Sequence, residues 1–323
     1  MKKILITGPF RESDLGCFSD IEGCELIYEK KATVETLKTA DGVLGWPDPL
    51  DLSEAANVKW LQTASAGVDN FLRVPGIFDN GLTITNLSGA FGQSISEFVL
   101  TYVLMLYKKA ELYRDNQRMC LWQDEGVQDS PVGKNLLILG AGNIGSDIAK
   151  LFRPFGCHIT GVRRTPREIP EEFDEMITLK ELDEVLPEQD IIACALPETP
   201  ETHKLINEER LKKFKDSAIL VNVGRGGLID TDALCKALSE GRLWGAALDV
   251  TDPEPLPADH PIWKVKNAII TPHITGGSIG HLKATEEKLI AICRENLIRF
   301  TKDKPLLNVV DPSTGYRKVE DRY

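Results

Sequence analysis

The 323-residue sequence lacks the segments that mark membrane and secreted proteins. Its longest apolar run, residues 98–107, is interrupted by Thr101 and is too short to cross a bilayer. The apolar stretch that follows the first lysines, residues 4–6, is also too short for a secretory signal. We therefore expect a protein without a membrane partner that stays in the cytoplasm.

Paired cysteines and an excess of positive charge are also missing. The seven cysteines are scattered, without a Cys-x-x-Cys pair and without Cys and His at zinc spacing, so we expect no structural metal and a reducing compartment. The 38 basic residues are outnumbered by 49 acidic ones, which gives a net charge of −11. This balance argues against non-specific binding to nucleic acid or anionic membranes.

Short β-type runs that alternate with helices are present in two blocks, and their length suggests two domains. The first block fills roughly the first ninety residues. The second runs from Asn135 to about Pro272. We expect two Rossmann-like α/β domains: a doubly wound parallel sheet that binds a dinucleotide, residues 95–276, and a smaller flavodoxin-like substrate domain, residues 1–94 plus 277–323. The expected strands are residues 3–7, 24–28, 42–44, 58–63, 82–86, 136–139, 158–163, 190–195, 218–223, 245–250 and 268–271.

Two long helices are expected to link these domains. The first opens at Ser94, where Ser94–Glu97 matches a capping box, and its apolar pattern continues toward Met119. The second spans residues 278–300. Because the first helix lies between the two blocks, we expect it to act as a hinge.

A glycine motif follows the first strand of the second block. Gly140, Gly142 and Gly145 have the spacing Gly-x-Gly-x-x-Gly, and a helix follows directly. In such a motif the first glycine allows the tight turn, the second lets the backbone approach a pyrophosphate, and the third lets the helix pack on its strand. The N–H groups at the start of that helix, including those of Asn143 and Ile144, would face the phosphates.

Three later strand ends each carry one ionisable residue: Arg225, Glu254 and His273. A guanidinium can hold a carboxylate through two parallel hydrogen bonds. An imidazolium can give a proton to a carbonyl oxygen, and a carboxylate beside the imidazole favours its charged form and fixes its tautomer. Each residue alone is more often structural, but together they provide what the reduction of a 2-oxo acid requires.

With these segments the chain resembles the D-isomer-specific 2-hydroxyacid dehydrogenase family, in particular its NADP-preferring glyoxylate/hydroxypyruvate reductases. The resemblance covers nearly the whole chain, and Arg225, Glu254 and His273 are separated by 29 and 19 residues, as in the family. The other matching segments are Leu196-Pro197-x-Thr199-x-x-Thr202, residues 222–226, 248–250, 254–257 and 271–273.

The resemblance implies a role for each of these residues. Arg225 would bind the carboxylate and carbonyl of the substrate, His273 would be the acid/base, and Glu254 would be its partner. Asp249 would contact the nicotinamide amide. It also implies further cofactor-binding residues, a substrate loop whose N–H groups hold the carboxylate, and a homodimer. The further cofactor-binding residues are Leu196, Pro197, Thr202, Val223 and Gly224, and the loop is Ser65, Ala66, Gly67 and Val68.

The second strand of the dinucleotide domain bears on the choice of cofactor. An NAD enzyme would place Asp or Glu at its end to hold the ribose hydroxyls. Here Arg163, Arg164 and Thr165 stand at that place, and the first acidic residue is Glu168. Two guanidiniums and a hydroxyl suit a 2′-phosphate, so we expect NADP, with NAD as the alternative.

We therefore expect an enzyme that transfers a hydride between NADP(H) and a small 2-oxo or D-2-hydroxy acid. Substrate choice is expected near Trp46 and the Ser65 loop. Trp122, just after the first long helix, would either reach a pocket or pack in an interface. The alternative is a dinucleotide-sensing binding protein on the same fold, resembling the transcriptional corepressors of the family.

Overall fold

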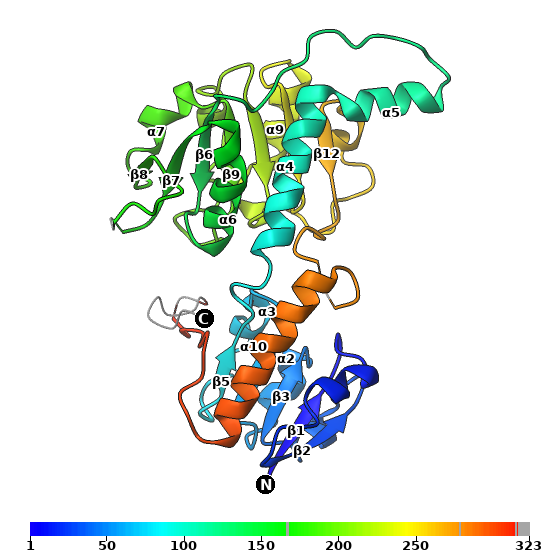
Figure 1. Ribbon diagram of the computed structural model, residues 1–323, viewed down its shortest axis with the longest axis vertical. Helices are drawn as coiled ribbons and strands as arrows, with labels where there is room; N and C mark the ends of the chain where they lie inside the picture. Colours follow the sequence, from blue (N-terminus) through cyan, green and yellow to red (C-terminus); the bar gives the residue numbers. More distant parts are fainter. Residues whose placement is uncertain (166–167, 278, 314, 316–323) are drawn as a thin grey trace. The chain divides into compact units, whose positions relative to one another are not determined.

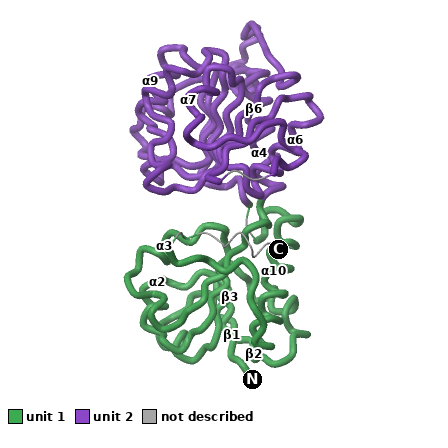
Figure 2. The backbone as a smooth tube through the Cα atoms, turned by 90° about the vertical axis from the view of Figure 1, so that its left-hand side faces the viewer, with its two compact units in different colours: residues 1–91, 277–323 green, residues 92–276 purple. Residues whose placement is uncertain are grey.

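The chain forms two compact units in the computed structural model, which describes residues 1–165, 168–277, 279–313 and 315. Unit 1 comprises residues 1–91 and 277–323, and unit 2 comprises residues 92–276 (Figure 2). The chain thus passes between the units after residues 91 and 276, and the domains expected from the sequence change after residues 94 and 276.

Unit 1 is built on a five-stranded parallel sheet with the order β2-β1-β3-β4-β5, the flavodoxin-like order that was expected (Figure 1). Its helices include α10, which starts at Lys283 instead of at the expected Ser278, a residue outside the described part. The strands are β1 (Lys2–Ile6), β2 (Cys24–Tyr28), β3 (Gly42–Gly45), β4 (Trp60–Thr63) and β5 (Thr83–Thr85). The helices are η1 (Glu12–Cys17), α1 (Val34–Leu37), α2 (Pro49–Ser53), α3 (Asp69–Leu72) and α10 (Lys283–Thr301).

Unit 2 is built on a seven-stranded parallel sheet with the order β12-β11-β10-β9-β6-β7-β8. Starting from β6, the chain adds strands first to one side and then to the other, which is the doubly wound arrangement. The central strands are almost continuously apolar because both of their faces are covered. The strands are β6 (Asn135–Leu139), β7 (His158–Val162), β8 (Glu175–Ile177), β9 (Ile191–Cys194), β10 (Ile219–Asn222), β11 (Gly245–Leu248) and β12 (Ala268–Ile270).

The helices of unit 2 begin with the long α4, whose buried side chains recur every three or four residues and face its core. This helix packs against α6, the helix of the glycine motif. The elements are α4 (Gly92–Lys108), α5 (Ala110–Arg118), α6 (Asn143–Phe152), η2 (Arg153–Phe155), α7 (Leu182–Val185), η3 (Leu186–Glu188), α8 (Glu208–Leu211), η4 (Gly226–Leu228), α9 (Thr231–Ser239) and η5 (Pro261–Lys264).

The predicted fold class is confirmed, and the sequence interpretation was wrong in three local features. Ser94 does not cap a helix, because α4 begins at Gly92 and the Ser94 hydroxyl donates to the carbonyl of Thr275 at 2.7 Å. The helix does not continue to Met119, because Lys109 adopts a left-handed φ of 54° between α4 and α5. Strand β8 was missed, since its three residues carry no alternating pattern.

The described residues contain no helix that is long and apolar enough to cross a membrane.

Candidate active site

The three glycines of the motif occupy three different environments between β6 and α6. Gly140 has a left-handed φ of 108°, and a Cβ there would lie 2.8 Å from the backbone of Ala195. A Cβ on Gly145 would lie 2.2 Å from the carbonyl oxygen of Gly140. A Cβ on Gly142 would meet no protein atom within 4 Å. The fold itself thus demands the outer two glycines, whereas Gly142 leaves open space beside the backbone.

That open space lies where the sheet of unit 2 reverses its strand order, between β6 and β9, which is where doubly wound sheets bind dinucleotides. Helix α6 starts there at Asn143, its N-cap Gly142 has no side chain, and Asn143 is exposed. N–H groups at a helix start attract phosphate. The residues present therefore fit a dinucleotide, as the motif predicts.

Arg163 stands at the end of β7, beside the glycine motif. Its Nε donates to the carbonyl oxygen of Ala141 at 2.9 Å, which holds the half-buried guanidinium against the loop. Arg164 and Thr165 follow and are exposed, as is Glu168. The end of β7 thus presents positive charge where an NAD enzyme would present a carboxylate.

The loops that follow β9 and β10 lie against each other. A Cβ on Gly224 would lie 2.6 Å from the carbonyl oxygen of Leu196, so only glycine allows this approach. Thr202 is buried, and its hydroxyl donates to the carbonyl oxygen of Pro197 at 2.7 Å. Thr202 thus shapes the loop after β9, and its contact with a cofactor stays a prediction, as do those of Leu196, Pro197, Val223 and Gly224.

Arg225 follows β10 and is half-buried. Asn222, the last residue of β10, organises this turn: its side chain donates to the carbonyl oxygen of Arg225 at 2.9 Å and accepts from the N–H of Gly224 at 3.1 Å. A Cβ on Gly226 would lie 1.9 Å from the carbonyl oxygen of Thr251, which follows β11. The guanidinium is therefore carried by a turn that is packed against the neighbouring strand end.

His273 and Glu254 form a pair, as the sequence predicted. The Nδ1 of His273 lies 2.7 Å from the Oε1 of Glu254. The histidine side chain is 51% exposed and the glutamate side chain 42% exposed, so solutes can reach both. Since Glu254 follows β11 and His273 follows β12, two adjacent strands bring together residues that are 19 positions apart.

His273 has an unusual backbone. Its φ of 54° lies in the left-handed region, which a residue with a Cβ rarely adopts and which costs on the order of 1–3 kcal/mol. Such a conformation persists only where the surroundings impose it. The shortest hydrogen bond of the His273 backbone is to Asp249, whose carbonyl oxygen accepts the N–H of His273 at 2.8 Å.

Asp249 is placed differently from what its predicted role suggests. The side chain is buried, and its carboxylate accepts four hydrogen bonds, from the hydroxyls of Thr271 and Thr275 and from the N–H groups of Ile274 and Thr275. These bonds occupy the acceptor sites of a carboxylate. The expected contact of Asp249 with the nicotinamide amide stays a prediction. The hydrogen bonds between Asp249 and residues 271–275 could not be predicted from the sequence.

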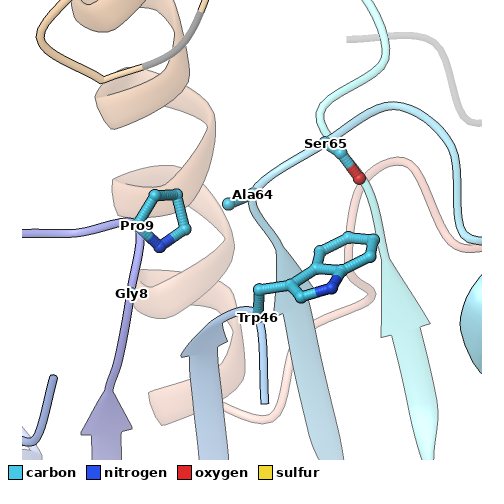
Figure 3. A pocket seen from close by; sticks show the side chains of 5 residues that line it. All are labelled: Gly8, Pro9, Trp46, Ala64 and Ser65. Atoms are coloured by element: carbon cyan, nitrogen blue, oxygen red, sulfur yellow. The ribbon is translucent and has the colours of Figure 1, made fainter. Parts of the chain in front are cut away.

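Unit 1 contains a hollow of about 470 Å³ at the carboxyl ends of β1, β3 and β4. Figure 3 shows the indole of Trp46 and the side chains of Pro9, Ala64 and Ser65 around it. The indole is held edge-on against Phe71, with ring centroids 4.8 Å apart. The sheet of unit 1 reverses its strand order between β1 and β3, so this hollow lies where such sheets bind ligands.

The loop Ser65–Val68 borders that hollow and leads into α3. Its carbonyl groups are used as acceptors: Leu87 donates to Ser65, and the side chain of Asn86 donates to Ala66. Within the ranges that the structure describes, the N–H groups of residues 66–68 donate to no protein acceptor. Ala66 and Gly67 are half-buried and Val68 is buried, so the N–H groups of Ala66 and Gly67 are the ones that a ligand can approach.

Trp122 lies on a long excursion of unit 2. In Figure 1, α5 and the segment after it extend away from the sheet of this unit. The Trp122 side chain is fully exposed, so the described part of its own unit does not enclose it in a pocket.

Comparison with known proteins identifies the family. The sequence model of the D-isomer specific 2-hydroxyacid dehydrogenase NAD binding domain matches residues 100–275. The chain is 33% identical over 287 residues to a glyoxylate/hydroxypyruvate reductase B from Pectobacterium carotovorum, an alignment that covers 85% of this chain and 87% of the relative.

Solved structures agree. A D-isomer specific 2-hydroxyacid dehydrogenase family protein from Aeromonas salmonicida has a TM-score of 0.85 and 33% identity, with 96% of this chain and 99% of that chain covered. An NADPH-dependent glyoxylate/hydroxypyruvate reductase from Sinorhizobium meliloti, solved with NADP and sulfate, has a TM-score of 0.80 and 25% identity, with 98% and 100% covered. The chain therefore belongs to the D-isomer specific 2-hydroxyacid dehydrogenase family and is an oxidoreductase with an NAD(P)-binding domain.

Proposed function

We propose that this enzyme uses NADPH to reduce a small 2-oxo acid to the D-2-hydroxy acid. The observation that carries this proposal is the 2.7 Å contact between His273 Nδ1 and Glu254 Oε1 at the carboxyl edge of the dinucleotide-binding sheet. Relatives named as glyoxylate or hydroxypyruvate reductases support the class of substrate.

In the proposed reaction His273 is the general acid. With Nδ1 facing Glu254, the proton that the substrate's carbonyl oxygen receives is held at Nε2. The negative charge of Glu254 stabilises the imidazolium and keeps the ring in that orientation. Arg225 holds the carboxylate through its planar fork and polarises the carbonyl group. Trp46 and the loop Ser65–Val68 are the proposed substrate-binding residues of unit 1.

The cofactor supplies the hydride when it is bound. Gly140, Gly142, Asn143, Ile144 and Gly145 would take its pyrophosphate, since the open space beside Gly142 and the start of α6 fit that group. Arg163, Arg164 and Thr165 would hold the 2′-phosphate. The remaining predicted cofactor residues are Leu196, Pro197, Thr202, Val223, Gly224, Asp249 and His273.

The experiment that tests this function is NADPH oxidation against a panel of 2-oxo acids, including glyoxylate, hydroxypyruvate, pyruvate and longer acids. We expect turnover of at least one acid and a product of D configuration. Tight NADPH binding without turnover of any acid would contradict the proposal and favour the dinucleotide-sensing binding protein.

We predict that Arg163→Ala together with Arg164→Ala raises the KM for NADPH by about 10- to 100-fold and leaves the KM for NADH nearly unchanged. The reason is that only NADPH carries the 2′-phosphate that these guanidiniums would hold. Steady-state kinetics with both cofactors measures the change.

Arg153→Ala is a matched control for this pair, because Arg153 forms an ion pair with Asp174 at 2.6 Å and follows the far end of α6. It should alter neither KM. If the double variant raised both KM values equally, the arginines would not be reading the phosphate.

We also propose a homodimer, assembled through the excursion that contains α5. Several exposed apolar side chains follow α5 on the same segment. Single exposed apolar residues are normal on a protein surface, whereas a group of them indicates an interaction surface. Its members and their exposed fractions are Met119 (70%), Leu121 (46%), Trp122 (105%), Val127 (76%) and Val132 (65%).

The cytoplasmic location expected from the sequence stays a prediction.

Light scattering after gel filtration should give twice the chain mass of 35.8 kDa for the wild-type protein. Replacing Leu121 and Trp122 by Asp should shift the mass toward one chain, because a buried, unpaired charge is costly in an apolar interface. Leu50→Asp, at a leucine of unit 1 that is 65% exposed, should leave the mass unchanged. A monomeric wild-type protein would rule the dimer out.

A further inference from the structure

The carboxylate of Asp249 accepts hydrogen bonds from residues that precede and follow His273 in the chain. Before His273, the hydroxyl of Thr271 donates to Oδ1 of Asp249 at 2.6 Å. After it, the N–H of Ile274 donates to Oδ1 at 2.9 Å, and the N–H and hydroxyl of Thr275 donate to Oδ2 at 3.0 and 2.6 Å. One buried carboxylate thus determines the path of residues 271–275, including the left-handed turn at His273.

The network continues from this carboxylate to α4. The hydroxyl of Tyr102 lies 2.7 Å from that of Thr271. Thr271 has a single hydroxyl proton, and it is committed to the carboxylate, which accepts only. Tyr102 is therefore the donor to Thr271. Burial, aided by the charge of Asp249, raises the pKa of Tyr102 to about 12, so its hydroxyl keeps the proton that this bond needs.

A second link to α4 lies at the other end of the segment. The hydroxyl of Ser94 donates to the carbonyl oxygen of Thr275 at 2.7 Å. Ser94, Tyr102 and Thr275 are all almost completely buried. None of the three side chains can reach a solute, so their effect on a reaction must pass through the loop that they hold.

We propose that Thr275, Thr271 and Tyr102 are positioning residues that act through Asp249 to hold His273 in its left-handed conformation, with its imidazole against Glu254. The inference rests on the proposed function only in taking His273 as the general acid. Asp249 would then serve mainly as the anchor of the catalytic loop. Helix α4 would thereby influence the reaction from behind the site, through hydrogen bonds instead of substrate contacts.

Thr275→Val tests the proposal, because it removes one donor to Asp249 and keeps nearly the same shape. We expect kcat to fall about tenfold, since a hydrogen bond to a buried charge is lost, while the KM for NADPH stays within about twofold. Thr275→Ser keeps the hydroxyl and should restore kcat. An unchanged kcat in the valine variant, or a serine variant no better than valine, would overturn the proposal.

The second measurement does not depend on turnover. Long-range ¹H–¹⁵N spectra report the tautomer of each of the five histidines, and the signal of His273 is assigned by its loss in His273→Ala. Thr275→Val should move the His273 signal and leave that of His260 in place. If kcat fell and the His273 signal did not move, Thr275 would be acting by another route. Failure of the proposed function would be seen separately, as a wild-type protein that reduces no 2-oxo acid.

Tyr102→Phe covers the case in which the valine variant does not fold. It removes one hydroxyl group at the end of the network, so we expect a smaller fall in kcat, about two- to threefold, with the same displacement of the His273 signal. In the His273→Ala background neither change should lower kcat further, because the group that they position is gone. Additive effects there would contradict the proposal.

Discussion

Replacing His273 by alanine is expected to lower kcat for the reduction of a 2-oxo acid by about two to four orders of magnitude, the range typical of a lost general acid. The carbonyl oxygen must gain a proton as hydride arrives at its carbon, and the imidazole held by Glu254 at 2.7 Å is placed to give it. Since His273 would act mainly in the transition state, the KM for NADPH should change little.

His203 offers a matched control for this variant. Its Nδ1 lies 2.9 Å from Glu198 Oε1, and the two side chains are 49% and 41% exposed, close to the values of the His273 pair. His203→Ala removes a similar histidine–glutamate contact on the same unit and should leave kcat within about twofold. If the two variants lost similar amounts of kcat, the loss would be a general effect of removing a histidine–glutamate pair. That result would contradict the proposed role of His273 as the general acid.

Replacing Arg225 by alanine is expected to lower kcat/KM for the 2-oxo acid by about 100- to 1,000-fold. The side chain would hold the substrate's carboxylate and stabilise charge that develops on the carbonyl oxygen, so both affinity and turnover should suffer. Arg225→Lys keeps the charge but not the planar fork, and it should recover only part of the loss. The measurement is steady-state kinetics with varied acid at saturating NADPH.

Two comparisons separate substrate binding from general damage at Arg225. The dissociation constant for NADPH, followed by fluorescence, should stay close to that of the wild type. Arg242→Ala is a suitable control, because Arg242 pairs with Glu240 on the surface of the same unit and has no proposed role. A variant in which the KM for the acid did not change would argue that Arg225 does not bind the carboxylate.

Most of the architecture follows from local patterns. The buried strands could be located because parallel sheets covered on both faces require continuous apolar runs, as in Leu136–Leu139. The glycine motif was also readable, because Gly140 and Gly145 are required by close backbone contacts that every dinucleotide fold of this kind makes. Strand β8 could not be found, since three residues are too few to show a period.

The early end of α4 has a physical cause that lies outside the local sequence. The indole of Trp244 donates to the carbonyl oxygen of Leu106 at 2.9 Å and so satisfies an acceptor in the last turn of α4. Lys109 then takes a left-handed conformation, and the helix does not continue. Because Trp244 is 138 residues away from Leu106, the sequence around Leu106 gives no indication of this hydrogen bond.

The sequence by itself determined the two α/β units, the glycine motif and the residue types that meet at the strand ends, because these depend on hydrophobic period, turn chemistry and short spacings. The tertiary structure alone decided how His273 is held. Asp249 and Thr275 are 26 residues apart, and Ser94 and Thr275 are 181 apart. Their hydrogen bonds exist because the sheet brings neighbouring strand ends together and α4 packs behind them, and no local pattern encodes which hydroxyl meets which oxygen.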